Sequence, residues 1–185
     1  MLTDSQIQEL AGKMNVPLES VSFKDELPAK LKFNRAYIIN LENEFDAEGL
    51  PNQGSHWCAF EIVKDNDGKI QPIYFDPFGV GPPLAVSDAV FAFCGKKLPH
   101  TEKDIQSIMA SCCGFFCLAF LHWINSSLFR SGHVYADTAA FLGMFDDLGV
   151  VVSHLKNEFI LKHFFRSADP EKRIPVELTN TITNS

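Results

Sequence analysis

The chain has 185 residues, enough for one domain with a sizeable core, and we predict a single domain over residues 1–185. A net charge of −7 argues against a general nucleic-acid-binding surface, because phosphate binding needs clustered Lys and Arg. The sequence has no run of about 18 uninterrupted apolar residues, so we expect neither a membrane span nor a membrane partner.

The first part of the chain predicts one short helix and one strand. Thr3 and Gln6 match a capping box at the start of a helix over residues 3–14, which carries an apolar stripe at helical spacing. Two prolines interrupt residues 16–33, and we expect this segment to be a surface loop. Residues 36–41 are apolar enough to form a strand.

A β-hairpin is the strongest local prediction in the middle of the chain. Residues 42–55 are acidic and contain Gly and Pro, so we expect an exposed loop before an apolar strand at residues 57–63. The turn signal Asp-Asn-Asp-Gly at residues 65–68 leads into a returning strand at residues 70–75. The Gly- and Pro-rich segment 77–83 cannot continue that strand.

The next segments predict shorter elements and then a buried helix. We expect a helix at residues 87–93, a short strand or loop at residues 96–102 and a further short strand at residues 105–108. Apolar side chains then recur at 3.6-residue spacing over residues 113–128, with few charges on any face. This pattern indicates a helix that is buried on most sides.

Two more helices are predicted after the buried one, at residues 136–148 and 153–165, and we expect a loosely ordered tail after about residue 168. Strands in the first half and helices in the second half favour the α+β class. The predicted architecture is therefore a small mixed β-sheet packed against helices, with Cys113 at the N-terminus of a central buried helix.

The five cysteines lie at positions 58, 94, 112, 113 and 117. Their odd number, their irregular spacing and the lack of a signal peptide indicate a reducing, intracellular compartment and argue against secretion. Zinc is a poor fit, because Cys113 and Cys117 have no second pair of ligands at matching spacing. We expect no metal site.

Cys113 stands at the predicted start of the buried helix and is followed by Gly114. The positive end of a helix dipole stabilises a thiolate, which is the nucleophilic form of cysteine. Gln106, seven residues earlier, can donate its amide to an oxyanion together with the backbone N–H of Cys113. Cys112 is not followed by glycine, and we expect it to point into the wall of the site or into the core.

A thiol nucleophile also needs a base and a group that orients the base. His56 precedes one strand of the predicted hairpin and Asp76 follows the other, so the two side chains are expected to touch. Trp57 would pack beside the site and shield the Cys–His pair from water. Taken singly, each residue has a simpler explanation, as an edge histidine, a turn aspartate or a core cysteine.

Together the motifs Gly54-Ser-His-Trp57, Phe75-Asp-Pro-Phe-Gly79 and Gln106-x6-Cys-Gly-x-x-Cys117 resemble a known family. They are similar to the adenovirus maturation proteases (adenains), the SUMO-specific proteases and related cysteine proteases of large DNA viruses and virophages. The similarity covers about a third of the chain, from His56 to Trp123.

The resemblance implies an α+β papain-like fold with rearranged chain order and a thiol endopeptidase or isopeptidase that cleaves after small residues, Gly above all. It implies Cys113 as nucleophile, His56 as base, Asp76 as orienting acid and Gln106 as oxyanion donor. Trp57 would narrow the substrate cleft, and Gly114 would leave the backbone uncrowded around the reacting carbonyl.

The chain departs from adenain in two respects. Adenain has Glu at the place of Asp76, whereas the SUMO proteases have Asp. Adenain is basic and uses DNA as a cofactor; this chain is acidic, so DNA activation is not carried over and no cofactor is expected. Adenain also binds an activating peptide through a cysteine shortly before its glutamine. Cys94 lies near the corresponding place, where a buried structural thiol is the favoured interpretation.

The leading hypothesis is a monomeric endopeptidase whose polypeptide substrates are viral structural precursors, acting at the virus assembly site and in the virion. A second hypothesis is a deconjugating isopeptidase for a ubiquitin-like modifier, which would need an added surface to hold the folded modifier. A third is a catalytically silent relative that serves as a binding or scaffold protein.

Overall fold

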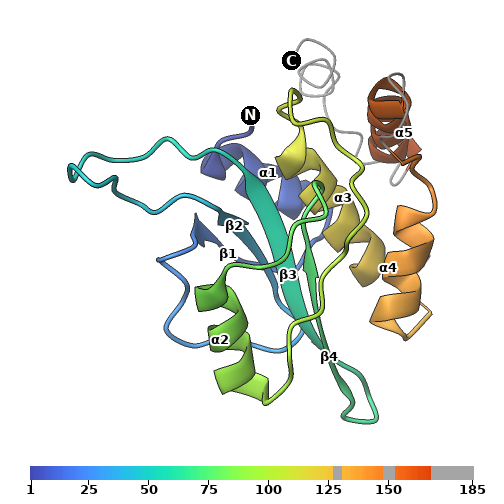
Figure 1. Ribbon diagram of the computed structural model, residues 1–185. Helices are drawn as coiled ribbons and strands as arrows, with labels where there is room; N and C mark the ends of the chain where they lie inside the picture. Colours follow the sequence, from blue (N-terminus) through green and yellow to red (C-terminus); the bar gives the residue numbers. More distant parts are fainter. Residues whose placement is uncertain (127–130, 148–152, 168–185) are drawn as a thin grey trace.

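The computed structural model describes residues 1–126, 131–147 and 153–167 (Figure 1). In this part of the chain, a four-stranded mixed sheet is combined with five helices, as expected for the α+β class. None of the described helices has the length and apolar character needed to cross a membrane. The predicted tail after residue 168 lies outside the described residues.

The four strands follow one another in space in the order in which they occur in the chain. They are β1 (Leu18–Phe23), β2 (Ala36–Asn40), β3 (Trp57–Lys64) and β4 (Ile70–Phe75). β1 and β2 are parallel, whereas β2 with β3 and β3 with β4 are antiparallel. The predicted hairpin is therefore confirmed, and its turn is closed by Asp65, whose side chain accepts hydrogen bonds from two backbone N–H groups.

The described helices are α1 (Asp4–Lys13), α2 (Leu84–Cys94), α3 (Cys113–Asn125), α4 (Val134–Leu142) and α5 (Ser153–Ser167). The predicted capping box at α1 is confirmed, with both of its hydrogen bonds between Thr3 and Gln6 present. The helix predicted at residues 87–93 is longer at both ends, since α2 runs from Leu84 to Cys94. Pro83 is its N-cap, and Gly95, in the left-handed conformation, is its C-cap.

Helices cover both faces of the sheet (Figure 1). One apolar cluster joins one face to α1 and α3, and a second joins the opposite face to α2. Every residue of α3 from Cys113 to Leu121 is buried, as the evenly apolar sequence predicts. This burial fixes the N-terminus of α3 against the first residues of β3, since the two elements pack directly together.

Several sequence-based predictions are wrong in detail. Residues 16–33 are not all loop, because β1 forms there. All six residues of β1 are half-buried and three of them are polar, so the strand has only a weak apolar signal in the sequence. No strand forms at residues 105–108: Ile105 is buried but Ile108 is 83% exposed. Residues 96–102, expected as a short strand or a loop, form a loop with one bridge, between His100 and Tyr74.

Two helices are shorter than predicted. α3 ends at Asn125 and α4 ends at Leu142, next to Gly143. The remainder of the predicted range 113–128 lies partly outside the described residues. The loop over residues 42–55 projects away from the sheet between β2 and β3, as Figure 1 shows, and most of its residues are exposed.

Gly79 is a position where the fold depends on glycine. Its φ is +70°, and a Cβ added there would lie 2.5 Å from the carbonyl oxygen of Glu102. We expect Gly79→Ala to lower the free energy of unfolding by roughly 2–4 kcal/mol, since backbone strain and a backbone clash act together. Chemical denaturation would measure this loss.

Gly49→Ala is the matched control. Gly49 has a φ of +77° but no atom within 4 Å of an added Cβ, so only the conformational cost of about 1–2 kcal/mol applies. Equal losses at the two positions would show that the contact with Glu102 does not constrain the turn.

Candidate active site

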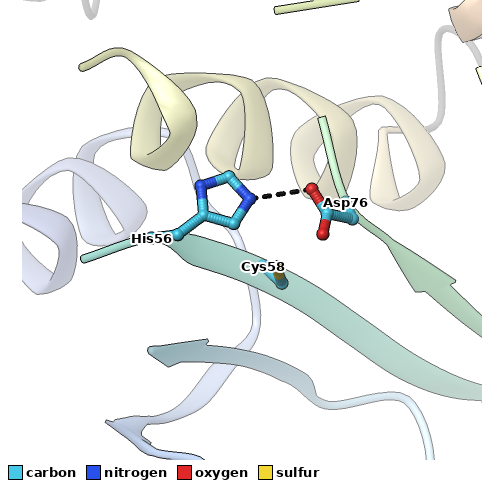
Figure 2. A group of neighbouring side chains, drawn as sticks. All are labelled: His56, Cys58 and Asp76. Carbon is cyan, nitrogen blue, oxygen red and sulfur yellow. Dashed lines mark hydrogen bonds and ion pairs between the residues drawn. The ribbon is translucent and has the colours of Figure 1, made fainter. Parts of the chain in front are cut away.

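The ends of two strands and the start of a helix meet at one place. His56 directly precedes β3, Asp76 directly follows β4, and Cys113 is the first residue of α3. The Nε2–H of His56 donates a hydrogen bond of 2.8 Å to Oδ1 of Asp76 (Figure 2). The expectation that these two side chains touch across the hairpin is therefore confirmed.

The carboxylate of Asp76 is held by the turn in which it lies. Its Oδ1 also accepts a hydrogen bond from the backbone N–H of Phe78 at 2.8 Å, and its carbonyl accepts one from Gly79. The carboxylate is fully buried, and its Oδ2 has no hydrogen-bond partner among the described residues. A buried carboxylate fixed in this way is suited to orienting a charged imidazole.

His56 is arranged to carry a positive charge. Burial alone would lower its pKa, but the hydrogen bond with Asp76 and the neighbouring thiols of Cys113 and Cys58 outweigh burial and raise the pKa to about 12. The ring of Phe78 stacks on the imidazole with centroids 4.1 Å apart and planes 10° apart. A cation over an aromatic face is stabilised further. Sequence reasoning missed this role of Phe78, although the residue belongs to the Asp-Pro-Phe-Gly motif.

Cys113 is placed by the backbone of Trp57. The N–H of Trp57 donates to Sγ of Cys113 at 3.5 Å, and Sγ of Cys117, one helical turn later, donates to the carbonyl of Trp57 at 3.3 Å. Both sulfur atoms therefore face β3. Because Asp76 uses Nε2 of His56, Nδ1 is the ring nitrogen that remains for the neighbouring thiol of Cys113. Cys113 itself is only 2% exposed.

Cys112 and Cys117 have environments that favour neutral thiols. Burial raises the pKa of Cys112 and of Cys117, and both are enclosed in the core around α3. Cys112 forms the residue before α3 and is buried, as expected from the sequence. Cys94 lies half-buried at the end of α2, where its Sγ donates to the carbonyl of Val90.

Gln106 is tied to the same turn as Asp76. Its backbone N–H donates to the carbonyl of Pro77 at 3.2 Å, as does that of Ile105 at 2.9 Å. Its side-chain Nε2 donates to the carbonyl of Ala110 at 2.9 Å. An amide has two N–H groups, so one remains for a second acceptor. The side chain is almost fully buried, and Gln106 lies in the segment between α2 and α3 of the chain.

Asn40, at the end of β2, holds the segment that leads to His56. Its Oδ1 accepts hydrogen bonds from the backbone N–H groups of Ser55 and Glu42, both at 3.1 Å. Gly54, with a φ of +80°, allows the chain to pass close to Asn40. No motif in the sequence pointed to Asn40; the only sequence signal nearby is Gly54, two residues before His56.

Neither a protein-family model nor a curated protein matches the chain. The chemistry of the site is therefore the basis for assigning a function. Its parts are a thiol at a helix N-terminus, a charged imidazole within reach of the thiol and a buried carboxylate that orients the imidazole.

A metal is one alternative use of these residues. The ligand atoms of His56, Cys58 and Asp76 all lie within 4.8 Å of one another (Figure 2). Zinc needs a thiolate, however, and burial raises the pKa of Cys58 to about 12. Since Asp76 already accepts from His56, the group is better suited to supporting a charged histidine than to binding a metal.

Proposed function

We propose that the protein is a cysteine endopeptidase with Cys113 as its nucleophile. The observation that supports this most strongly is the buried hydrogen bond of 2.8 Å between His56 and Asp76, beside a thiol that begins α3. Nucleophile, base and orienting acid come from three separate elements and are brought together by the fold, which is how thiol hydrolases are built.

The reaction begins with the thiolate of Cys113 and the imidazolium of His56. The sulfur attacks the carbonyl carbon of the substrate and forms a tetrahedral intermediate. His56 gives its Nδ1 proton to the leaving amine as the C–N bond breaks, which leaves an acyl-enzyme. Neutral His56 then takes a proton from water, the resulting hydroxide attacks the thioester, and the acid product and the thiolate are released.

Two donors are available for the oxyanion of each tetrahedral intermediate. One is the backbone N–H of Cys113, at the first turn of α3, where helix N–H groups have no partner within the helix. The other is the second N–H of the Gln106 amide, the first being used by Ala110. Both donors are held by backbone contacts, so little reorganisation is needed during the reaction.

We further propose a papain-like arrangement of the adenain type, with viral structural precursors as substrates and cleavage after small residues. The chain order His56, Asp76, Gln106, Cys113 and the three motifs that contain them support this proposal. The protein would act as a monomer at the virus assembly site and in the virion. Trp57 is buried beside the nucleophile, which fits a narrow cleft.

A fluorogenic Gly-Gly peptide tests the proposed function. We expect turnover that iodoacetamide abolishes by alkylating Cys113, and peptide mass spectrometry would locate the alkylated residue.

Co-expression with candidate capsid proteins would then identify the cleavage sites. Faster processing of ubiquitin-like fusions than of unfolded peptides would favour a deconjugating enzyme, and an unreactive Cys113 at neutral pH would favour a silent binding protein.

Gln106→Ala is expected to lower kcat by about 10²–10³-fold with little change in KM, the usual effect of removing one oxyanion donor. Steady-state kinetics with the Gly-Gly peptide would measure this. Gln8→Ala, on the exposed side of α1, is the matched control and should leave kcat unchanged. A change of less than about threefold for Gln106→Ala would remove Gln106 from the oxyanion site.

A further inference from the structure

We infer that Leu2 is a positioning residue that fixes the ring of Trp57 over Gly114 and so determines how wide the cleft beside Cys113 can be. The effect on substrate selection rests on the proposed function. The contacts between Leu2, Trp57 and Gly114 are independent of that function. Leu2 belongs to none of the sequence motifs of the site.

The ring of Trp57 is held by the chain that precedes α1. Its Nε1–H donates a buried hydrogen bond of 2.9 Å to the carbonyl oxygen of Leu2. A buried indole N–H needs such an acceptor, because leaving it without one costs about 1–3 kcal/mol. The position of the ring therefore depends on where the backbone of Leu2 lies.

The side chain of Leu2 fills the space beside Gly114. A Cβ added at Gly114 would lie 3.2 Å from Cδ1 of Leu2 and 3.5 Å from Cδ1 of Trp57. Leu2, Trp57 and Gly114 are thus in contact with one another, directly beside the nucleophile. Nothing larger than hydrogen fits at Gly114 without displacing Leu2.

The capping box of α1 keeps Leu2 in place. The neighbouring residue Thr3 exchanges hydrogen bonds with Gln6, from Thr3 N–H to Oε1 at 2.9 Å and from Gln6 N–H to Oγ1 at 3.3 Å. Leu2 is only 4% exposed, although it precedes the first helix rather than lying within it. Its side chain belongs to the same apolar cluster as Trp57 and Cys113.

The consequence concerns the substrate residue next to the scissile bond. Cys113 and Trp57 are both almost completely buried, and the N–H of Trp57 contacts the sulfur of Cys113. Under the proposed function, a substrate that reaches this sulfur lies against Trp57. With the indole fixed, only a residue without a side chain passes. If Leu2 is truncated to alanine, its carbonyl still accepts from the indole, but the side chain no longer fills the space beside the ring and Gly114. The ring then has room to move, and we expect residues larger than glycine to be accepted.

Leu2→Ala tests this role. Two peptides are compared, one with Gly and one with Ala before the cleaved bond. We expect the ratio of kcat/KM for the Gly peptide to kcat/KM for the Ala peptide to fall by about tenfold, the scale set by one methyl group in a pocket. Leu2→Met, which conserves the volume, should restore the ratio. Leu84→Ala, at an exposed position of α2, is the control.

A second readout does not depend on proteolysis. In a Trp123→Phe background, acrylamide quenching of the remaining Trp57 should increase with Leu2→Ala, and a bulky maleimide should label Cys113 faster relative to iodoacetamide. Unchanged quenching and labelling would overturn the inference. Changed quenching without turnover by the parent protein would uphold the role of Leu2 in positioning Trp57 and overturn the proposed function instead.

Discussion

Replacing Cys113 with alanine is expected to abolish peptide hydrolysis, with a loss of kcat/KM of about 10⁴-fold or more, because burial raises the pKa of the neighbouring thiols of Cys58 and Cys112 and keeps them neutral. The fold should be retained, since the sulfur is only one acceptor for the N–H of Trp57 and α3 remains buried on its other sides. Hydrolysis of the Gly-Gly peptide and a thermal unfolding curve of the same preparation would check both expectations.

Cys112→Ala is the matched control, because Cys112 is adjacent, equally buried and held as a neutral thiol by its raised pKa. This variant should keep most of the activity. The opposite pattern, with activity lost in Cys112→Ala and kept in Cys113→Ala, would show that the nucleophile has been assigned to the wrong residue.

Asp76→Asn should lower kcat by about 10³–10⁴-fold while leaving substrate binding nearly unchanged, as expected when the residue that orients a catalytic histidine loses its charge. The amide of asparagine cannot stabilise an imidazolium as the carboxylate does, although it preserves the size of the side chain. Steady-state kinetics separate the two effects. Unchanged turnover would remove Asp76 from the catalytic group.

The same variant has a second consequence, for the dependence of stability on pH. The pKa of His56 is raised in the folded protein from its ordinary value to about 12, in part by Asp76. The stabilisation is therefore complete below about pH 6.5 and decreases as the pH rises toward 12. Removing the carboxylate should cost most stability at pH 6 and less at pH 9.5.

Chemical denaturation of the parent protein and of Asp76→Asn at these two pH values measures the difference. Asp88→Asn, at an exposed position of α2, is the control and should show no such dependence. A difference between parent and Asp76→Asn that stays constant with pH would mean that Asp76 does not stabilise the charged form of His56.

The part of the site that sequence reasoning could predict is the part that local structure creates. His56 and Asp76 meet because two short strands are joined by a tight turn, and both the strands and the turn have clear sequence signals. The spacing of apolar residues also predicts a helix that starts at Cys113, and this start is confirmed.

The rest depends on packing between distant segments, which one sequence does not encode in any periodic pattern. The contact of Trp57 with Cys113 spans 56 residues and arises only when α3 packs on β3. Phe78 acts through the geometry of a turn, and Asn40 through the register of β2 beside β3. Even β1 was missed, because a half-buried strand lacks a strong apolar signal.

One residue connects the proposed base to the proposed nucleophile. Trp57 follows His56 in the chain, its N–H reaches the sulfur of Cys113, and its carbonyl accepts from Cys117. A shift of Trp57, the first residue of β3, would therefore displace His56 and Cys113 together. We expect the two side chains to respond to such a disturbance as a unit.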